Sequence, residues 1–453
     1  MNAPPPTTLR PHESFRSLLA HLEATGELKR ARRAVDPTHE LITVTLKNQK
    51  TLKKGSLFPD VTGSPTPVAT NVLSNRDRLA TALGFTPTDM IRQLEILEAQ
   101  PVAPVEVSEA PVQEIVVTDG VDIARDIPQI IHCEGDAGPY ITAGVCIARH
   151  PQDGTYNASW NRVQIVGGDH ARIRMMAPQH LGQYQELAEA DDTPLPVAMV
   201  IGAPPALMLS AASKIPLETD ELAVAGAWQR SPLRVAPAVS VPLMVPADAE
   251  FVIEGFVVPN AREVEGPYGE FTDTYVEPAK NHVLRVTAIT RRKDAVFHTI
   301  LAGAAEDITL LGVPLQVEVL KRVRSFADIV DIGTPGHLFG CVVSINKKSD
   351  EQARAVLMAA LAAHNWMKVC VVVDHDIDPH DAEEVLWAIH TRCRPDTGLY
   401  HIPRLGSFPR ADVRPVHKGK MAFDATVPMD LREVFARREF PGIEDIDLDA
   451  WFD

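Results

Sequence analysis

Two carboxylates around a tight turn are the feature of this sequence with the clearest chemical potential. Glu265 and Glu270 flank the four residues Gly-Pro-Tyr-Gly. Such a turn can aim both acids into one cavity, where mutual repulsion or apolar burial raises the pKa of one of them. A carboxyl group that keeps its proton near neutral pH can act as a general acid. The competing interpretation is a solvated polar turn between two strands.

An arginine that could oppose these acids lies in the segment NASWNR, which runs from Asn157 to Arg162 at the start of an alternating strand. The two residues are five positions apart, so a regular strand would place their side chains on opposite faces. They can share a site only if a bulge or a turn interrupts the strand. A surface position for the arginine is the plainer expectation.

Three further polar residues occur where either a ligand or an ordinary solvated side chain would fit. His180 stands at an expected helix start, where it could bind a metal or simply begin the helix. Glu221 opens the apolar helical segment DELAVAG, in which a solvated first-turn acid is the default. Lys420, in HKGKMAFDAT, could meet a phosphate or lie in solvent beside a strand.

The elements that must position these residues change character along the chain. The first part has helical spacing and one strand-like run, and the Pro-rich segment 101–112 is typical of a linker. The middle part is dominated by separated strands, which suggests a barrel-like sheet. The last third alternates strand and helix, the pattern of a parallel α/β layer. The expected elements are helices at 15–22, 40–49, 76–83, 206–212, 351–364 and 381–392, and strands at 68–72, 158–166, 171–176, 251–258, 282–290, 340–345 and 368–373.

Composition and missing motifs exclude several classes of protein. The chain has 44 Lys and Arg against 60 Asp and Glu, and this net charge of −16 argues against a general nucleic-acid or anionic-membrane binder. The five cysteines form no CxxC pair, so neither a disulfide framework nor a thiolate zinc site is expected. No GxGxxG, GxxxxGK[ST], HExxH or GxSxG motif occurs, which removes the commonest nucleotide-binding, zincin and esterase readings.

Neither a signal peptide nor a membrane span is expected. The N-terminal MNAPPPTTLRPHE has no apolar core, and prolines interrupt the longest uncharged run, 193–213, which predicts a strand, a turn and a short helix. A cytoplasmic location is the corresponding expectation.

Taken together, in this order and at these spacings, the segments resemble the UbiD family of reversible decarboxylases that use prenylated FMN. The resemblance spans nearly the whole chain, and several motifs in register make it specific. The matching segments are LEATGELKRARRAVDPTHEL, GSLFPDVTGSPTPVATNVLSNRDRLATALG, NASWNR, TPLPVAMVIGAPPALMLSAAS, DELAVAG, VEGPYGEFTDTY, VVVDHDIDPHDAEEVLWAIHTRCRP and GKMAFDAT.

The resemblance implies an α/β protein with α+β elements, built from three domains. Residues 1–112 would form a small N-terminal α/β domain and linker, and residues 113–315 a central split β-barrel that binds the flavin. Residues 316–453 would form a C-terminal α/β oligomerisation domain with a tail, and the protein would be a homodimer or a larger homo-oligomer.

The resemblance also assigns residues to the site. It implies a catalytic set and a set of ligands that hold Mn²⁺ or Mg²⁺ against the flavin phosphate, and it leaves open whether K⁺ is bound as well. Other matching positions line the flavin, although some of these side chains depart from those of relatives. The catalytic set is Arg162, Glu265 and Glu270; the metal ligands are Asn157, His180 and Glu221; the flavin segments contain Ser159, Trp160, Asn161, Gln179, Ser213 and Pro216, with Lys420 near the phosphate.

The chemistry of decarboxylation agrees with this assignment. Loss of CO₂ from an aromatic or vinylic carbon leaves an sp² carbanion that needs an organic electron sink, which the prenylated flavin would supply through a covalent adduct with the substrate. An amide oxygen, an imidazole and a carboxylate suit Mn²⁺ or Mg²⁺. Arg162, paired with Glu265, would position the substrate carboxylate, and Glu270 would donate the proton.

The expected partners are a carboxylic acid substrate, CO₂ and a flavin prenyltransferase that supplies the cofactor. The preferred substrate is an aromatic or heteroaromatic acid, and an α,β-unsaturated acid is the alternative substrate. Two other classes of function stay open: a non-catalytic flavin-binding or assembly protein, and an FMN-dependent reductase. The segments near 311–315 and 435–440 are candidates for setting substrate specificity.

Overall fold

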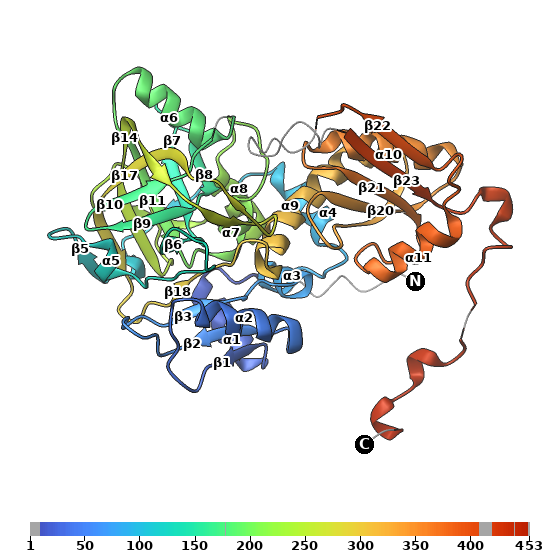
Figure 1. Cartoon of the computed structure of the whole chain (residues 1–453), viewed down its shortest axis with the longest axis horizontal. Helices are drawn as coiled ribbons and strands as arrows, with labels where there is room; N and C mark the ends of the chain where they lie inside the picture. The colour runs from blue at the N-terminus through green and yellow to red at the C-terminus, as the bar shows by residue number, and fades with distance from the viewer. Residues whose placement is uncertain (1–9, 177, 407–418, 439, 452–453) are drawn as a thin grey trace. The chain divides into compact units, whose positions relative to one another are not determined.

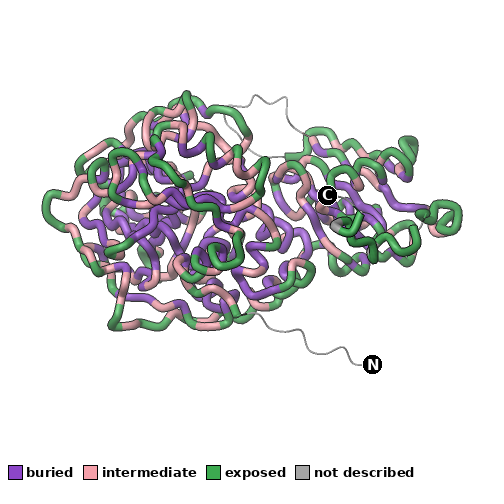
Figure 2. The backbone as a smooth tube through the Cα atoms, turned by 90° about the horizontal axis from the view of Figure 1, so that it is seen from below, coloured by how far each residue is buried: buried purple, intermediate pink, exposed green. Residues whose placement is uncertain are grey.

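The computed structural model of the protein describes residues 10–176, 178–406, 419–438 and 440–451. The contacts between residues divide the chain into two compact units, one ending at Lys321 and the other beginning at Arg322 (Figure 1). In both units the buried segments lie inside and the exposed segments outside (Figure 2).

The N-terminal part of the first unit is a small sheet with helices packed beside it. Its strands follow the order β1-β2-β3-β18, so the last strand joins from much later in the sequence. The helix α1 buries Phe15, Leu18 and Leu22, the helical spacing recognised in the sequence. The elements are α1 (Phe15–Ala24), β1 (Leu28–Arg30), α2 (Glu40–Thr51), β2 (Gly55–Phe58), β3 (Val68–Thr70), α3 (Arg76–Leu83), α4 (Met90–Glu98) and β18 (Phe297–His298).

The segment expected to be a linker is instead bonded to the rest of the unit. β4 (Val105–Glu106) pairs in parallel with β12 (Arg234–Pro237), which also pairs with β13 (Met244–Pro246). A short 3-10 helix, η1, covers Pro111–Gln113. The prolines correctly exclude a long helix here, but they leave enough backbone N–H groups for a short edge strand.

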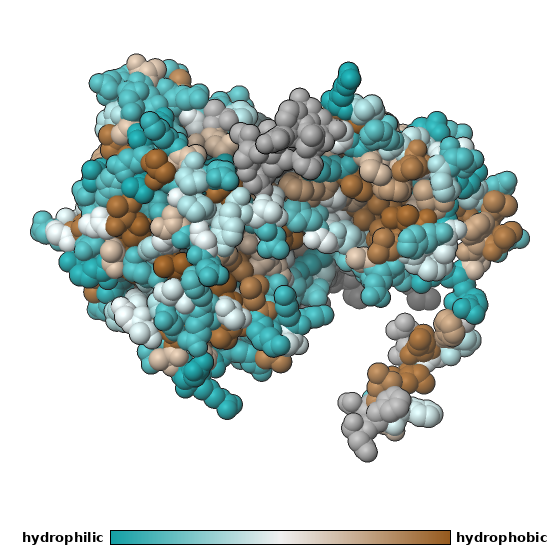
Figure 3. All heavy atoms as spheres, in the orientation of Figure 1, coloured by the Kyte–Doolittle hydropathy of each residue, from teal (hydrophilic) through white to brown (hydrophobic). Residues whose placement is uncertain are grey.

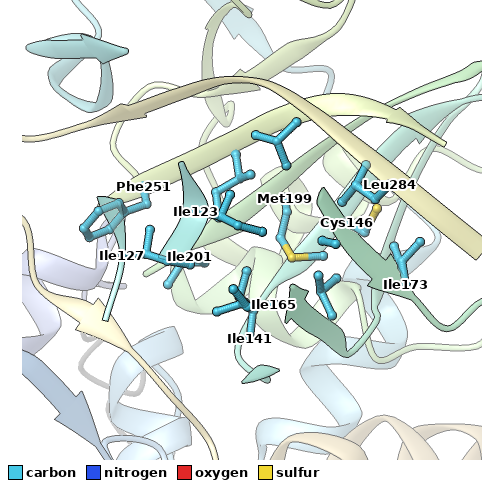
Figure 4. Packing of buried hydrophobic residues seen from close by; sticks show 14 of the residues in the cluster. Ile123, Ile127, Ile141, Cys146, Ile165, Ile173, Met199, Ile201, Phe251 and Leu284 are labelled. Carbon is cyan, nitrogen blue, oxygen red and sulfur yellow. The ribbon is translucent and has the colours of Figure 1, made fainter. Parts of the chain in front are cut away.

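A large antiparallel sheet forms the centre of the first unit. Its strands follow the order β6-β9-β10-β17-β14-β11-β7-β8, and β5 adds to β17. The long strands β14 and β17 run side by side, and Met199, Phe251 and Leu284 lie among its core residues (Figure 4). The strands are β5 (Ile115–Val117), β6 (Tyr140–Ile141), β7 (Val145–Arg149), β8 (Tyr156–Trp160), β9 (Val163–Gly167), β10 (His170–Ile173), β11 (Leu195–Ile201), β14 (Phe251–Glu265) and β17 (Ala279–Arg291); the helices nearby are α5 (Ile123–Asp126), α6 (His180–Ala190), α7 (Pro205–Ser210) and α8 (Glu221–Gln229).

One strand expected from the alternation is two strands. The prediction of a continuous strand over 158–166 was wrong, because β8 ends at Trp160 and β9 begins at Val163. Between them, Asn161 Nδ2 donates to the carbonyl oxygen of Arg174 at 2.9 Å and Asn161 Oδ1 accepts from Ser159 Oγ at 2.8 Å. In a continuous strand, backbone hydrogen bonds to the neighbouring strand would stand in place of these side-chain bonds. The break is the interruption that Asn157 and Arg162 need in order to share a site.

The second unit is an α/β layer, as the strand and helix alternation predicted. Its sheet has the order β19-β20-β21-β23-β22, in which β20, β21 and β23 are parallel and both edge strands are antiparallel. Val342, Val371 and Val373 pack against Val385 and Ala388 of a covering helix. The elements are β19 (Asp328–Gly333), β20 (Gly340–Asn346), α10 (Glu351–Ala363), β21 (Val369–Asp374), α11 (Ala382–Arg392), β22 (Leu399–Pro403) and β23 (Gly419–Ala425), and α9 (Ala305–Val323) precedes them.

The C-terminal segment is rich in exposed apolar residues (Figure 3). Ile443 is 62% exposed and Trp451 71%, in and beside the short 3-10 helices η4 (Ile443–Asp445) and η5 (Leu448–Ala450). Within the described residues, every helix is too short or too polar to cross a bilayer.

Candidate active site

Arg162 and Glu265 form a buried ion pair in the first unit. Arg162 lies in the break between β8 and β9, and Glu265 is the last residue of β14. Nε and Nη2 of the guanidinium donate to Oε1 and Oε2 of the carboxylate, each at 2.9 Å, and the two side chains are 8% and 1% exposed. Asn281 on β17 donates a further bond to Glu265 Oε2 at 2.7 Å. Two parallel charge-assisted bonds hold the guanidinium in one orientation.

Glu270 meets the same arginine from the other side of the turn. Gly266 has φ +93°, a conformation that favours glycine, and leads the chain into the hairpin of β15 (Tyr268–Glu270) and β16 (Thr274–Val276). Glu270 Oε1 accepts from Arg162 Nη1, and Arg174 Nη1 lies 3.6 Å from the same oxygen. Glu270 is 21% exposed, so it is the more accessible of the two acids. The structure thus brings together the three residues expected to be catalytic.

Aromatic rings and a neighbouring loop hold this hairpin in place. The Tyr268 ring lies 4.5 Å from the Arg162 guanidinium, and the Tyr140 ring lies 4.7 Å from Tyr268. Asp136 accepts from the backbone N–H of Gly269 at 2.8 Å. Burial raises the pKa of both Tyr140 and Tyr268, so these hydroxyl groups stay protonated at neutral pH.

Sequence reasoning missed several of these supporting residues. Tyr268 lies inside the recognised turn, so the motif itself could have indicated it. Asn281 and Asp136 reach the site from distant segments, and no local pattern marks them. Arg174 lies just after β10, and the alternation of the expected strand did not mark it as different from the other polar residues there.

The residues expected to bind a metal form a second cluster. Asn157 lies on β8, while His180 and Glu221 are the first residues of α6 and α8. Glu221 Oε1 accepts from Asn157 Nδ2 at 3.0 Å and lies 3.4 Å from His180 Nδ1. The preceding residue, Asp220, caps α8 by accepting from the N–H of Leu222 at 2.8 Å, so Glu221 is free to turn inward.

This cluster fits a divalent cation. The Glu221 side chain is 3% exposed, and its second oxygen is buried without a hydrogen-bond partner among the described residues. A buried carboxylate oxygen without a donor is costly, and a cation would satisfy it. The remaining donors, an amide and an imidazole, suit Mn²⁺ or Mg²⁺. In the part of the chain that the structure describes, no three His, Cys, Asp or Glu side chains gather at a metal site, so Asn157 would be an essential member.

The residues between the two clusters are tied to each other and to α7. Ser159 Oγ lies 3.3 Å from Asn157 Oδ1 and 2.8 Å from Asn161 Oδ1. Trp160 Nε1 donates to the carbonyl oxygen of Met208 at 2.7 Å. This segment therefore links the ion pair to the metal-type cluster within a few residues, as a flavin-lining segment would.

The other residues expected to line the flavin have few side-chain contacts. Gln179 immediately precedes α6 and is exposed, as is Pro216. Ser213 Oγ donates to the carbonyl oxygen of Leu209 at 3.1 Å. Their role toward a cofactor stays a prediction.

Lys420 belongs to the second unit. It is 4% exposed, and its Nζ donates to the carbonyl oxygens of Leu361 and His364 at the end of α10. Burial lowers the pKa of Lys420. Within its own unit the ammonium group therefore caps a helix, and an additional role toward a phosphate stays a prediction.

Three domain models of one protein family match this chain. The family model described as the 3-octaprenyl-4-hydroxybenzoate carboxy-lyase Rift-related domain matches residues 104–305. The corresponding N-terminal and C-terminal domain models match residues 19–96 and 307–425. The chain belongs to the UbiD family. It is a UbiD-type carboxy-lyase with the N-terminal, central and C-terminal domains of that family.

Curated relatives of this UbiD-family chain include two decarboxylases. It is 33% identical over 387 residues to the anhydromevalonate phosphate decarboxylase of Methanothermobacter thermautotrophicus, a match that covers 83% of this chain and 88% of the relative. It is 31% identical over 439 residues to the anhydromevalonate phosphate decarboxylase of Methanosarcina mazei, covering 94% and 99%.

Solved structures of UbiD-class enzymes share the whole fold. The complex of HmfF from Pelotomaculum thermopropionicum with FMN has a TM-score of 0.91 and 35% identity, covering 97% of this chain and 100% of that one. An evolved dimeric form of the same enzyme, in complex with prenylated FMN, has a TM-score of 0.88 at the same identity and coverage. The 3,4-dihydroxybenzoic acid decarboxylase of Enterobacter cloacae has a TM-score of 0.89 and 26% identity, covering 98% and 99%.

Proposed function

We propose that this UbiD-family enzyme catalyses the reversible, non-oxidative decarboxylation of an aromatic or heteroaromatic carboxylic acid, with prenylated FMN and Mn²⁺ or Mg²⁺ bound in its central domain. The observation that carries the proposal is the contact of two carboxylates, Glu265 and Glu270, with the single guanidinium of Arg162. A protein that only bound a flavin would have no use for paired acids on one arginine.

The geometry divides the work between the two acids. Glu265 occupies Nε and Nη2 of Arg162 and thereby fixes it, while Nη1 faces Glu270. An incoming substrate carboxylate can take the place of Glu270 on Nη1, because both are carboxylates that a guanidinium binds in the same way. Glu270, released from the arginine, is then free to hold a proton beside the reacting carbon.

The bond between the substrate carbon and its carboxylate breaks, CO₂ leaves, and the proton of Glu270 passes to the vacated carbon. When bound, the prenylated flavin supplies the electron sink for the pair that the departing CO₂ leaves behind. In the carboxylation direction Glu270 removes the proton as a base.

The second cluster would anchor the cofactor. Asn157, His180 and Glu221 would hold the cation, whose positive charge would bind the flavin phosphate. Ser159 and Trp160, tied to the same segment, would lie along the flavin. A flavin prenyltransferase would supply the cofactor, the central sheet would form the split barrel that surrounds it, and the C-terminal α/β domain would make a homodimer or a larger homo-oligomer.

The names of relatives support the substrate class in different degrees. The 3,4-dihydroxybenzoic and vanillic acid decarboxylases are named for aromatic acids. The curated relatives are named for anhydromevalonate phosphate. We therefore propose an α,β-unsaturated acid as the alternative substrate, to be compared directly with the aromatic acids.

The test begins with the cofactor. The chain is produced with and without a flavin prenyltransferase, and the absorbance spectrum, the mass of the bound small molecule and the metal content are recorded. The proposal predicts prenylated flavin and an equimolar divalent metal, followed by CO₂ release from an aromatic or heteroaromatic acid. Unmodified FMN, or no flavin, in protein supplied with the modified cofactor would instead favour a reductase or a flavin-binding protein.

A further inference from the structure

Asp307 lies beside the hairpin that carries Glu270. It stands in the first turn of α9, four residues after Gly303. Gly303 has φ +78°, and a Cβ atom there would lie 3.1 Å from the carbonyl oxygen of Phe271, the residue that follows Glu270. A side chain at this position would be strained and would crowd the Phe271 carbonyl, so glycine is favoured here, and the turn before α9 is packed on the backbone next to the proposed proton donor.

The two oxygens of the Asp307 carboxyl group are used differently. Oδ2 accepts from the backbone N–H of Gly303 at 2.7 Å, which fixes the side chain over the turn. Oδ1 takes no part in this bond, and Asp307 is partly rather than fully buried. The carboxyl group is thus held in place by one oxygen while the other is available for exchange.

The charged groups that act on Asp307 are negative. Burial raises the pKa of Asp307 to about 7, the N–H of Gly303 opposes that rise, and the charges of Glu270 and Glu306 add to it. In turn Asp307 contributes to the raised pKa of Tyr268, which lies on the same hairpin as Glu270. Near neutral pH this carboxyl group therefore exists in both its protonated and its charged form.

Such a group can serve the proposed reaction. Each turnover transfers the proton of Glu270 to the product carbon and leaves a carboxylate that must be protonated again. Among the residues that the structure describes, the basic side chains on Glu270 are Arg162 and Arg174, and an arginine does not give up its proton in a protein. A nearby acid that titrates around neutrality is suited to this exchange.

We propose that Asp307 is the proton-exchange partner of Glu270. After each turnover, protonated Asp307 passes its proton to the Glu270 carboxylate, directly or through one water molecule, and regains a proton from solvent. This inference rests on the proposed function, and Asp307 is a positioning and relay residue that acts through Glu270 rather than on the substrate.

Asp307→Asn separates this role from a structural one. The amide oxygen can still accept from the N–H of Gly303, but the side chain cannot carry the exchangeable proton. The matched control is Asp273→Asn, which removes a negative charge from an exposed position in the turn of the same hairpin. Both variants are prepared as holoenzyme, and kcat and KM are measured against pH.

The relay predicts that wild-type kcat falls as pH rises through about 7. D307N is expected to have kcat lowered by about tenfold below that pH, little change in KM, and no such alkaline limb. D273N keeps the wild-type profile. Asp307→Glu restores an ionisable group and recovers an alkaline limb at a shifted pH, because the longer side chain places its carboxyl group in different surroundings. A wild-type kcat and limb in D307N would overturn the inference.

Two further outcomes keep the inference apart from the function on which it rests. If wild-type holoenzyme releases CO₂ while D307N has an unmoved limb, the decarboxylase stands and the relay is lost. If wild-type holoenzyme releases no CO₂ from any acid tested, the proposed function itself fails. Should D307N not accumulate as folded protein, D307E decides, because a limb that stays at the wild-type pH with a longer side chain contradicts the relay.

Discussion

Arg162 and Glu265 face each other through two parallel hydrogen bonds of 2.9 Å in a place where both are almost fully buried. They come from different parts of the central sheet, the break after β8 and the end of β14. Burying two charges is costly unless their geometry is good, so this pair specifies how the two segments meet. The remaining nitrogen of the guanidinium, Nη1, donates to a second carboxylate, that of Glu270.

Arg162→Lys is expected to destabilise the protein and to remove activity. An ammonium group cannot make the two parallel bonds, so Glu265 would be left partly unpaired in a buried position. Breaking such a pair costs up to about 3–5 kcal/mol, and we expect a marked fall in melting temperature with loss of CO₂ release.

The control for this variant is Arg172→Lys. Arg172 also pairs with a glutamate, Glu263, but these side chains are 25% and 38% exposed, so the substitution should change the unfolding free energy by no more than about 1 kcal/mol. Equal melting temperatures for R162K and R172K would contradict the importance of the buried pair.

Glu270→Gln is expected to abolish turnover without loss of fold or cofactor. The amide keeps the shape of the side chain and can still bond to the arginine, but it has no proton to give at neutral pH. We predict a fall in kcat of at least about 100-fold, measured as CO₂ release, with an unchanged flavin spectrum. CO₂ release near the wild-type rate would show that another group donates the proton.

Glu221→Ala should yield folded protein that no longer retains metal and flavin. Its side chain provides the carboxylate of the metal-type cluster, and the remaining Asn157 and His180 bring no negative charge. Glu218→Ala removes an exposed acid three residues earlier and should retain both. Metal analysis and the flavin absorbance make the comparison, and full occupancy in E221A would remove Glu221 from the ligand set.

Treating the holoenzyme with a chelator should have the same effect as E221A. Because the cation would bridge the protein to the cofactor phosphate, its removal is expected to release flavin into the filtrate, and Mn²⁺ should allow rebinding. Flavin that stays fully bound in metal-free protein would mean that the cluster does not anchor the cofactor.

The raised pKa of Asp307 predicts a pH-dependent stability that requires no activity. The ordinary pKa of an aspartate is 3.8 and that of Asp307 in the folded protein is about 7, so folding favours the protonated form. The contribution of this group to stability is therefore full below pH 3.8, falls as pH rises between the two values, and stays low above pH 7. From pH 5 to pH 8, the melting temperature of D307N apoprotein should rise relative to that of wild-type apoprotein. A difference in melting temperature that stays constant over this range would contradict the shifted pKa.

Local patterns predicted the parts of the site that lie close together in sequence. Glu265 and Glu270 are joined by a short turn, so their convergence could be read from glycine and proline alone. The helix starts that carry His180 and Glu221 were likewise visible. The predictions for 158–166 and 101–112 were wrong in detail. Side-chain hydrogen bonds of Asn161 interrupt the first segment, and the second pairs with a strand that is distant in sequence, β12.

The supporting residues could not be predicted because register decides them. Asn281 reaches Glu265 only because β14 and β17 pair so that Glu265 lies opposite Ala279, and that register shifts between Val257 and Arg262. Asp136 holds Gly269 across a separation of 133 residues. Such contacts depend on how the whole sheet closes, which a single sequence does not reveal.

The most direct measurement is decarboxylation in D₂O by holoenzyme carrying prenylated flavin, with a panel of aromatic, heteroaromatic and α,β-unsaturated acids. We predict release of CO₂ from an aromatic or heteroaromatic acid, with a single deuterium at the vacated carbon and no reaction by E270Q. An enzyme fully loaded with prenylated flavin and metal that releases no CO₂ from any of these acids would contradict the proposed substrate class and chemistry.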